Sequence, residues 1–129
     1  MLNILLDTCT FLWLISDSME LSEHARDIFQ YDSASVLLSS VSVWEIVVKH
    51  ALGRLPLPDS PAQFIAGMRA LHAIEPLPLE EEAVLMLPKL PDIHRDPFDR
   101  MLVCQALAHG LSLLTPDSLI RQYPVPVVW

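Results

Sequence analysis

Short apolar runs of strand length alternate with longer segments of helical spacing along the 129-residue sequence. An uninterrupted apolar run of four to six residues is typical of a strand that is buried on both faces of a sheet. On this basis the pattern predicts five strands, at residues 3–6, 36–39, around 73–77, 111–115 and 126–128.

Helix start and stop signals divide the remaining sequence. Ser60-Pro61 and Asp96-Pro97 each combine an N-cap residue with proline in the first turn, and Gly53 and Gly110 stand where C′ glycines end helices. Three prolines make residues 88–97 unsuitable for a regular element. The predicted helices span residues 8–16, 22–30, 42 to about 52, 61 to about 71, about 79–87, 97 to about 109, and 117–122.

The alternation of strands and helices indicates a parallel sheet with helices on both faces. The length favours a single domain over residues 1–129, an α/β sandwich. Hydrophobic residues make up 52% of the chain and charged residues 19%, which excludes a disordered chain. The net charge of −8 gives no broad attraction for nucleic acid or anionic lipid, so binding either would need cations or placed arginines.

Cysteine usage and apolar runs bear on the compartment. Cys9 and Cys104 are too few for a disulfide scaffold, and their apolar contexts predict buried thiols in a reducing compartment. Asp7 interrupts the first apolar run, which no basic segment precedes, and residues 101–116 fall short of a membrane span. We therefore expect a cytoplasmic protein that does not enter a membrane.

Four acidic residues share one predicted place in the fold. Asp7 directly follows the first strand and Asp117 follows the fourth, whereas Glu45 and Asp99 lie in the first turns of helices beside the same edge. In open α/β sheets, ligands bind outside the carboxyl ends of the strands. Carboxylates gathered there repel one another, by about 4 kcal/mol for a pair at 4 Å and an effective dielectric near 20, unless they bind protons or a divalent cation. Oxygen ligands favour Mg²⁺ or Mn²⁺, and the chemistry implied is metal-assisted phosphodiester hydrolysis.

Structural roles compete with this interpretation at three of the predicted helices. A bare Asp7 inside an apolar run would be costly without a function, but Ser42-x-x-Glu45 also matches a capping box, and Glu45 is spaced to pair with Lys49. Asp96 is the natural N-cap of its helix. Asp99 could complement the helix dipole, and Asp117 could cap the short last helix.

The other polar and aromatic residues carry weaker signals. Arg95 and Arg100 flank the acids at positions 96 and 99. They could hold phosphate oxygens or only balance charge. The apolar residues 11–15 suggest an interface with a subunit or partner. The tryptophans fit a core or interface better than base stacking, and the histidines, which lack metal-ligand spacing, fit surface or capping positions; these are Trp13, Trp44 and Trp129, and His24, His50, His72, His94 and His109.

Several segments in order carry a family resemblance: Asp7-Thr8 after the first strand, SVWEI at residues 42–46, HRDPFDR at 94–100, TPD at 115–117, and a close with YPV at 123–125 and a terminal Trp129. Over essentially the full chain the sequence resembles the PIN domain family, specifically the VapC-type toxins of type II toxin–antitoxin pairs. The resemblance implies a five-stranded parallel sheet flanked by helices and a Mg²⁺- or Mn²⁺-dependent ribonuclease. It also implies a homodimer, neutralised by a VapB-type antitoxin whose C-terminal segment covers the acidic groove.

The resemblance assigns the acidic quartet to Asp7, Glu45, Asp99 and Asp117, with Asp96 as an extra acid of the subgroup. The hypothesis is that Asp7 and Asp99 hold the main Mg²⁺ while Asp117 and Glu45 bind through water or support a second ion. Cys9 departs from the family, because many relatives carry histidine at that position.

Two other function classes require residues that this sequence lacks at the necessary positions. A receiver domain needs a lysine at the end of a late strand, but the only lysines are Lys49 and Lys89. A haloacid-dehalogenase-like phosphatase needs a second aspartate where Cys9 stands. The remaining alternative is a catalytically silent PIN-fold module that binds RNA or protein.

Overall fold

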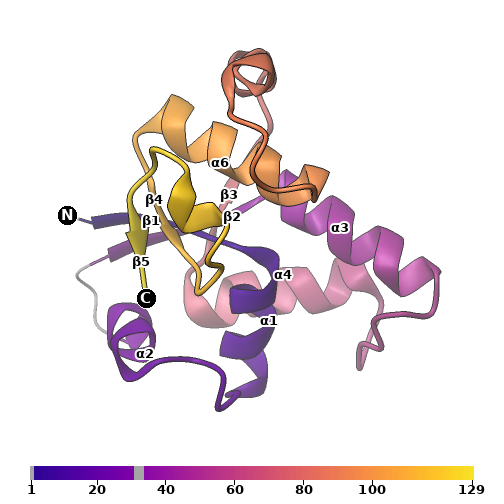
Figure 1. The fold of residues 1–129 in the computed structure, drawn as a ribbon. Coiled ribbons are helices and arrows are strands. Elements are labelled where there is room, and N and C mark those ends of the chain that lie inside the picture. Colours follow the sequence, from indigo (N-terminus) through magenta and orange to yellow (C-terminus); the bar gives the residue numbers. More distant parts are fainter. Residues whose placement is uncertain (1, 31–33) are drawn as a thin grey trace.

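A five-stranded parallel sheet lies at the centre of the computed structural model, which describes residues 2–30 and 34–129 (Figure 1). Every pair of neighbouring strands is parallel and the order is β3-β2-β1-β4-β5, which confirms the predicted α/β fold. The strands are β1 (Leu2–Leu6), β2 (Ala34–Ser39), β3 (Glu75–Leu77), β4 (Ser112–Leu114) and β5 (Val127–Val128).

Helices cover both faces of this sheet, so the fold is an α/β/α sandwich (Figure 1). The α-helices are α1 (Thr8–Ser16), α2 (Glu23–Gln30), α3 (Ser40–Ala51), α4 (Pro61–His72), α5 (Glu81–Val84) and α6 (Pro97–His109), and single 3₁₀ turns span Leu87–Lys89 and Ile120–Gln122. Among the described residues, none of these helices is both long and apolar enough to cross a membrane.

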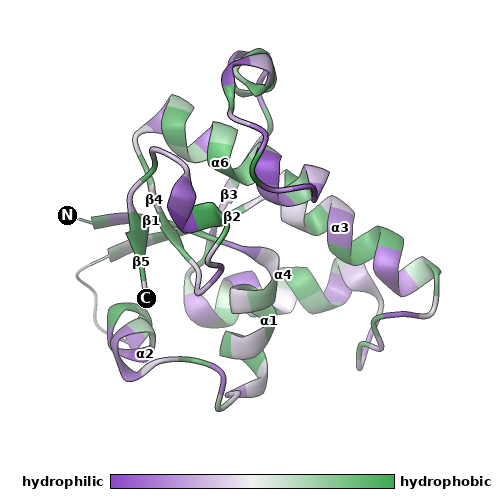
Figure 2. Cartoon of the chain, viewed as in Figure 1, coloured by the Kyte–Doolittle hydropathy of each residue, from purple (hydrophilic) through white to green (hydrophobic). Residues whose placement is uncertain are grey.

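Alternation along the strands divides the core into two clusters. Ile4 and Leu6 of β1 pack with Phe11 of α1 on one face, whereas Leu5 packs with Leu102 of α6 on the other. All five side chains are fully buried. Apolar residues accordingly line the strands and the sheet-facing side of α6 (Figure 2). The continuous apolar runs therefore predict the strands because both faces of the sheet are covered.

Several helix boundaries follow the predicted signals. The Ser60 side chain accepts a hydrogen bond from the Gln63 amide at the start of α4, and Asp96 caps α6 in the same way. Gly53 and Gly110 follow α3 and α6 with φ of 71° and 66°, a left-handed conformation that glycine adopts without strain.

The beginning of α3 differs from the prediction. The Ser39 hydroxyl accepts a hydrogen bond from the Val41 amide, so Ser39 is the N-cap and the helix begins two residues earlier than predicted. Glu45 consequently lies in the second turn, and the predicted capping box from Ser42 to Glu45 is wrong. Both side chains are buried and free to make contacts outside the helix.

The segment before α6 is also less regular than the helical spacing suggested. The predicted helix at residues 79–87 is only the single turn of α5. Pro88 lacks the backbone N–H that would continue an α-helix, and a 3₁₀ turn takes its place. Residues 90–96 are irregular, as predicted, and Pro97 begins α6.

The two cysteines have different surroundings. Cys104 in α6 is fully buried, as predicted, but Cys9 in the first turn of α1 is exposed, which corrects the expectation of a buried thiol. Its exposure reflects where α1 begins, at the carboxyl-end edge of the sheet rather than over its face.

The chain reverses its direction of strand addition between β1 and β4. From β1 it adds β2 and β3 on one side, and it then returns to add β4 and β5 on the other. At such a switch point the loops that follow two adjacent strands diverge and leave a crevice for a ligand. Asp7 follows β1 and Asp117 follows β4, so both lie at this crevice.

Candidate functional site

Asp7 is fixed at the end of β1 by hydrogen bonds to both of its carboxylate oxygens. Oδ1 accepts from the Thr10 amide at 2.7 Å as the N-cap of α1, and Oδ2 accepts from the Thr115 hydroxyl. The same hydroxyl accepts from the Asp117 amide at 3.1 Å, which joins the ends of β1 and β4. Burial raises the pKa of Asp7 in spite of the hydrogen bonds from Thr10 and Thr115. Among residues 2–30 and 34–129, no cationic side chain pairs with this buried carboxylate.

Glu45 reaches the same edge from α3. Its Oε1 lies 2.7 Å from the Thr8 hydroxyl, which lies 3.0 Å from the Ser42 hydroxyl, so Thr8 donates to the carboxylate and accepts from Ser42. Its Oε2 pairs with the Lys49 ammonium, and this hydrogen bond raises the pKa of Lys49. Glu45 is thus oriented by Thr8 and Lys49, with Ser42 behind Thr8, and is 4% exposed.

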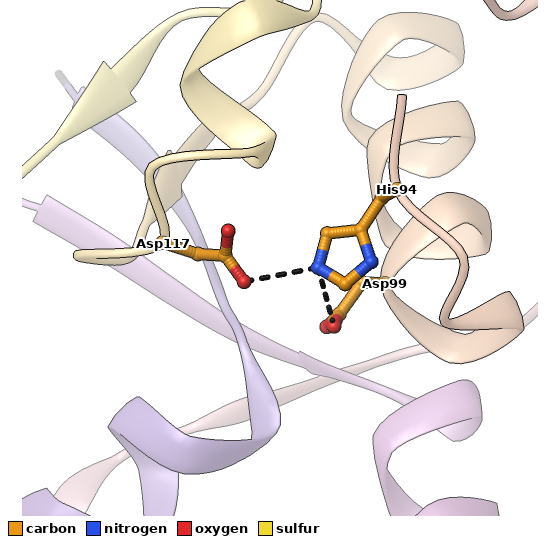
Figure 3. A group of neighbouring side chains, drawn as sticks. All are labelled: His94, Asp99 and Asp117. Atoms are coloured by element: carbon orange, nitrogen blue, oxygen red, sulfur yellow. Dashed lines mark hydrogen bonds and ion pairs between the residues drawn. The ribbon is translucent and has the colours of Figure 1, made fainter. Parts of the chain in front are cut away.

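Asp99 and Asp117 meet at the ring of His94 (Figure 3). The His94 Nε2 atom lies 3.2 Å from Oδ2 of Asp99 and 3.0 Å from Oδ2 of Asp117. The other Asp117 oxygen, Oδ1, accepts from the backbone amides of Leu119 and Ile120. Burial would raise the pKa of Asp117, but these hydrogen bonds outweigh it and hold the pKa below its usual value. Asp117 therefore caps the turn after β4 and also faces the cluster.

Asp99 is partly buried among three other carboxylates. Burial raises its pKa to about 7, aided by the negative charges of Asp96, Asp7 and Glu45. Partial desolvation and the charges of Asp7 and Glu45 also raise the pKa of the nearby Cys9 thiol to about 11. At neutral pH this thiol is protonated and a poor nucleophile, so the chemistry of this edge belongs to its carboxylates.

Asp96 serves α6 as its N-cap. Its Oδ1 accepts from the Phe98 amide at 2.8 Å and from the Asp99 amide at 3.4 Å. We expect Asp96→Ala to lower the free energy of unfolding by about 1 kcal/mol relative to Asp96→Asn, whose amide oxygen can still cap the helix. Urea unfolding in EDTA measures this difference, and because both variants remove the charge, only the cap separates them. Equal stabilities of the two variants would contradict the capping role.

The two arginines beside these acids differ in their surroundings. Arg100 donates through Nη1 to the Pro91 carbonyl at 3.1 Å and to the Tyr123 hydroxyl at 3.3 Å, so it braces the segment that leads into α6. Arg95 is exposed.

The tryptophans were expected in the core or at an interface, and none of the three is fully buried. Trp44, next to Glu45, is 59% exposed and makes an edge contact with Phe98, with ring centroids 4.9 Å apart. Trp13 and Trp129 are partly buried and make an edge contact with one another, with ring centroids 6.0 Å apart.

The structure brings the four predicted acids to one edge of the sheet, where they affect one another electrostatically. Within residues 2–30 and 34–129, one group has ligand atoms that all lie within 4.8 Å of one another, and it consists of Asp99, Asp117 and His94. His94 was expected at a surface or capping position, but its side chain is only 12% exposed and lies between these two acids. Its position in the segment leading into α6 was the available signal, since that segment must end at the same edge as Asp99.

The donor set fits a divalent cation. Asp7 and Asp99 have raised pKa values because they are buried among other carboxylates, and Lys49 neutralises only Glu45. A cation at this edge would relieve the repulsion, and carboxylate oxygens are the ligands that Mg²⁺ and Mn²⁺ prefer.

Comparison with known proteins agrees with this fold. A chain in the crystal structure of VapBC2 from Rickettsia felis bound to a promoter DNA fragment superposes with a TM-score of 0.76 at 10% identity, covering 98% of both chains. A chain of DNA-bound VapBC from Salmonella typhimurium gives 0.69 at 20% identity, covering 99% of this chain and 98% of that one. VapBC-1 from nontypeable Haemophilus influenzae gives 0.66 at 18% identity, covering 98% and 97%.

No curated protein matches the sequence. The sequence model of the PIN domain, however, matches residues 4–126, which include the whole sheet except its first two residues and its last two. With the five-stranded parallel sheet and the acids at its switch point, this match establishes that the chain belongs to the PIN domain family.

Proposed function

We propose that this PIN domain is a Mg²⁺- or Mn²⁺-dependent endoribonuclease and the toxin of a VapBC-type toxin–antitoxin pair. The observation that carries the proposal is the convergence of Asp7, Glu45, Asp99 and Asp117 at the switch point of the sheet. Four acids from four separate segments are a costly arrangement for stability alone. Because they nevertheless lie together at one edge, we infer that they bind a cation and, through it, a phosphodiester.

The four acids differ in their surroundings, and we assign them different roles in metal binding accordingly. Asp7 and Asp99, the two acids with raised pKa values, would hold the main cation, and Asp117 and Glu45 would bind through water or support a second ion. Asp96 is occupied as a helix cap, although it adds negative charge to Asp99. When bound, Mg²⁺ or Mn²⁺ supplies an activated water and neutralises charge on the phosphodiester.

RNA binding requires a local reversal of the net charge of −8. Exposed Arg95 could contact phosphate oxygens, and the second guanidinium nitrogen of Arg100 could do so while its first braces Tyr123. Lys49 lies at the same edge through its pair with Glu45. Bound cations would add to these charges next to the site.

Besides the acidic groove that an antitoxin segment would cover, the antitoxin and a second copy of the chain need further surfaces. A cavity of about 630 Å³ lies between α1, α2 and the end of α4, lined by Leu14, Ile15, Phe29 and the 70% exposed Leu71 among others. Polar side chains, among them Asp17 and Arg26, line the cavity together with these apolar ones, and a groove of this mixed kind suits an amphipathic antitoxin segment. The similar structures are VapBC complexes, which supports a VapB-type antitoxin as the partner, and we propose that the chain forms a homodimer.

The direct test is incubation of purified protein with a mixed RNA substrate. We expect cleavage with Mg²⁺ or Mn²⁺ and none with EDTA, because in the proposed mechanism the bound cation activates the attacking water and neutralises the phosphodiester. Addition of the cognate antitoxin is expected to suppress cleavage. RNA binding without cleavage under any metal would favour the catalytically silent module, and cleavage in EDTA would contradict the metal-dependent mechanism.

A further inference from the structure

The ring of His94 is held in one orientation by the backbone around it. The His94 amide donates to the Tyr123 hydroxyl at 2.7 Å, and the ring Nδ1 lies 3.1 Å from the Asp96 amide. The side chain is 12% exposed. Because an amide can only donate, Nδ1 accepts from Asp96 and carries no proton. The ring is therefore the neutral tautomer, with its proton on Nε2.

The Nε2 proton faces two carboxylates from different parts of the chain (Figure 3). Asp99 lies in the first turn of α6, and Asp117 lies in the loop after β4, and their Oδ2 atoms are 3.2 and 3.0 Å from Nε2. Nε2 hydrogen-bonds to Asp117 and also lies close to Asp99, so one N–H group faces two acids that would otherwise repel each other. His94 connects the two elements across the crevice.

This tautomer makes the ring a donor and not a metal ligand. An imidazole binds a metal through an unshared electron pair, but the pair on Nδ1 is taken by the Asp96 amide and Nε2 carries the proton. The Asp117 oxygen that accepts from Nε2 still has a second lone pair, and the Asp99 oxygen beside Nε2 keeps its lone pairs as well. Asp99 and Asp117 can therefore bind a cation while His94 holds them.

We propose that His94 is a positioning residue, whose Nε2–H holds Asp99 and Asp117 at a spacing from which both can share one divalent cation. The inference rests on the proposed function, because it assumes that these acids bind a metal. Hydrogen-bond partners that orient the ligands of a metal typically change its affinity 10- to 100-fold when they are removed. His94 would do so here by keeping two mutually repelling ligands together before the cation arrives.

Calorimetric titration with Mn²⁺ tests this inference without any RNA. We expect His94→Ala to weaken Mn²⁺ binding about 10- to 100-fold. We expect His94→Gln to stay within about threefold of the wild type, because the glutamine amide can place an N–H donor near the position of Nε2. Thermal unfolding in EDTA and circular dichroism establish that each variant is folded. A merely structural histidine would not be rescued by glutamine in this way.

Each remaining outcome contradicts the inference in a distinguishable manner. Equal or tighter Mn²⁺ binding by folded His94→Ala would show that the ring does not prepare the site. Equal losses in the alanine and glutamine variants would show that the ring itself, as a ligand or a spacer, is what matters. If the wild type binds no Mn²⁺, both the inference and the proposed metal-dependent function are wrong. If it binds Mn²⁺ but does not cleave RNA, only the proposed function is wrong.

Discussion

Replacement of Asp99 by asparagine is expected to lower the rate of RNA cleavage by at least ~100-fold, equivalent to about 2.7 kcal/mol of transition-state stabilisation. The carboxamide keeps the shape of the side chain but loses the charge that would hold the cation. Asp99 is the best choice for this test because its side-chain carboxylate contacts His94 and is not a helix cap. The measurement is a single-turnover cleavage rate at saturating Mg²⁺.

A second readout separates loss of metal binding from loss of structure. Because burial and neighbouring carboxylates raise the pKa of Asp99 to about 7, its ionised form destabilises the metal-free protein at pH 8. Asp99→Asn should therefore be at least as stable as the wild type in EDTA while its activity falls. Glu82→Gln, which removes an exposed charge from α5, is the matched control and should cleave at the wild-type rate. A folded Asp99→Asn protein with wild-type activity would contradict the assignment.

The sequence predicts the parts of this site that depend on topology. Asp7 and Asp117 could be placed together because each comes shortly after an apolar run, and these runs are typical of buried parallel strands. Strand ends meet at one edge whatever the details of the loops. The same reasoning could place Asp99, since α6 must begin at the edge from which it returns to β4.

Contacts that depend on the choice between similar residues could not be predicted in this way. In the run Ser39-Ser40-Val41-Ser42, any of the three hydroxyls could cap a helix, and only the end of β2 selects Ser39. This selection frees Ser42 to bond with Thr8, and Thr8 to bond with Glu45.

The role of His94 is another feature that residue spacing in the sequence could not predict. A search for metal-ligand spacing passes over it because its nearest partner across the crevice, Asp117, lies 23 residues away. Its tautomer is set by the Asp96 amide, a backbone group whose direction depends on the turn before α6. Side-chain roles that are determined by backbone direction become visible only in the folded structure.

In the absence of metal, the melting temperature is expected to fall as the pH rises from 5 to 8, and saturating Mg²⁺ is expected to remove most of the fall. The pKa of Asp99 is raised from 3.8 to about 7 in the folded protein, and that of Asp7 is raised as well. Between about pH 4 and pH 7 the folded state therefore binds more protons than the unfolded state, so the free energy of unfolding decreases with pH. The lowered pKa of Asp117 has its effect below this range and does not oppose the trend.

The size of the effect follows from Asp99, which is 20% exposed. The difference between about 7 and 3.8 is roughly three pH units, which sets an upper limit of about 4 kcal/mol. At ~3 to 5 °C per kcal/mol for a chain of this length, the melting temperature in EDTA should fall by up to ~10 to 20 °C. Mg²⁺ binds the ionised carboxylates, so the stabilisation that it provides should grow over the same pH range. Asp99→Asn should flatten the pH dependence in EDTA, because it removes the carboxyl that titrates near pH 7. A melting temperature that rises with pH in EDTA, or a stabilisation by Mg²⁺ that is the same at pH 5 and pH 8, would mean that these acids do not form the strained cluster on which metal binding depends.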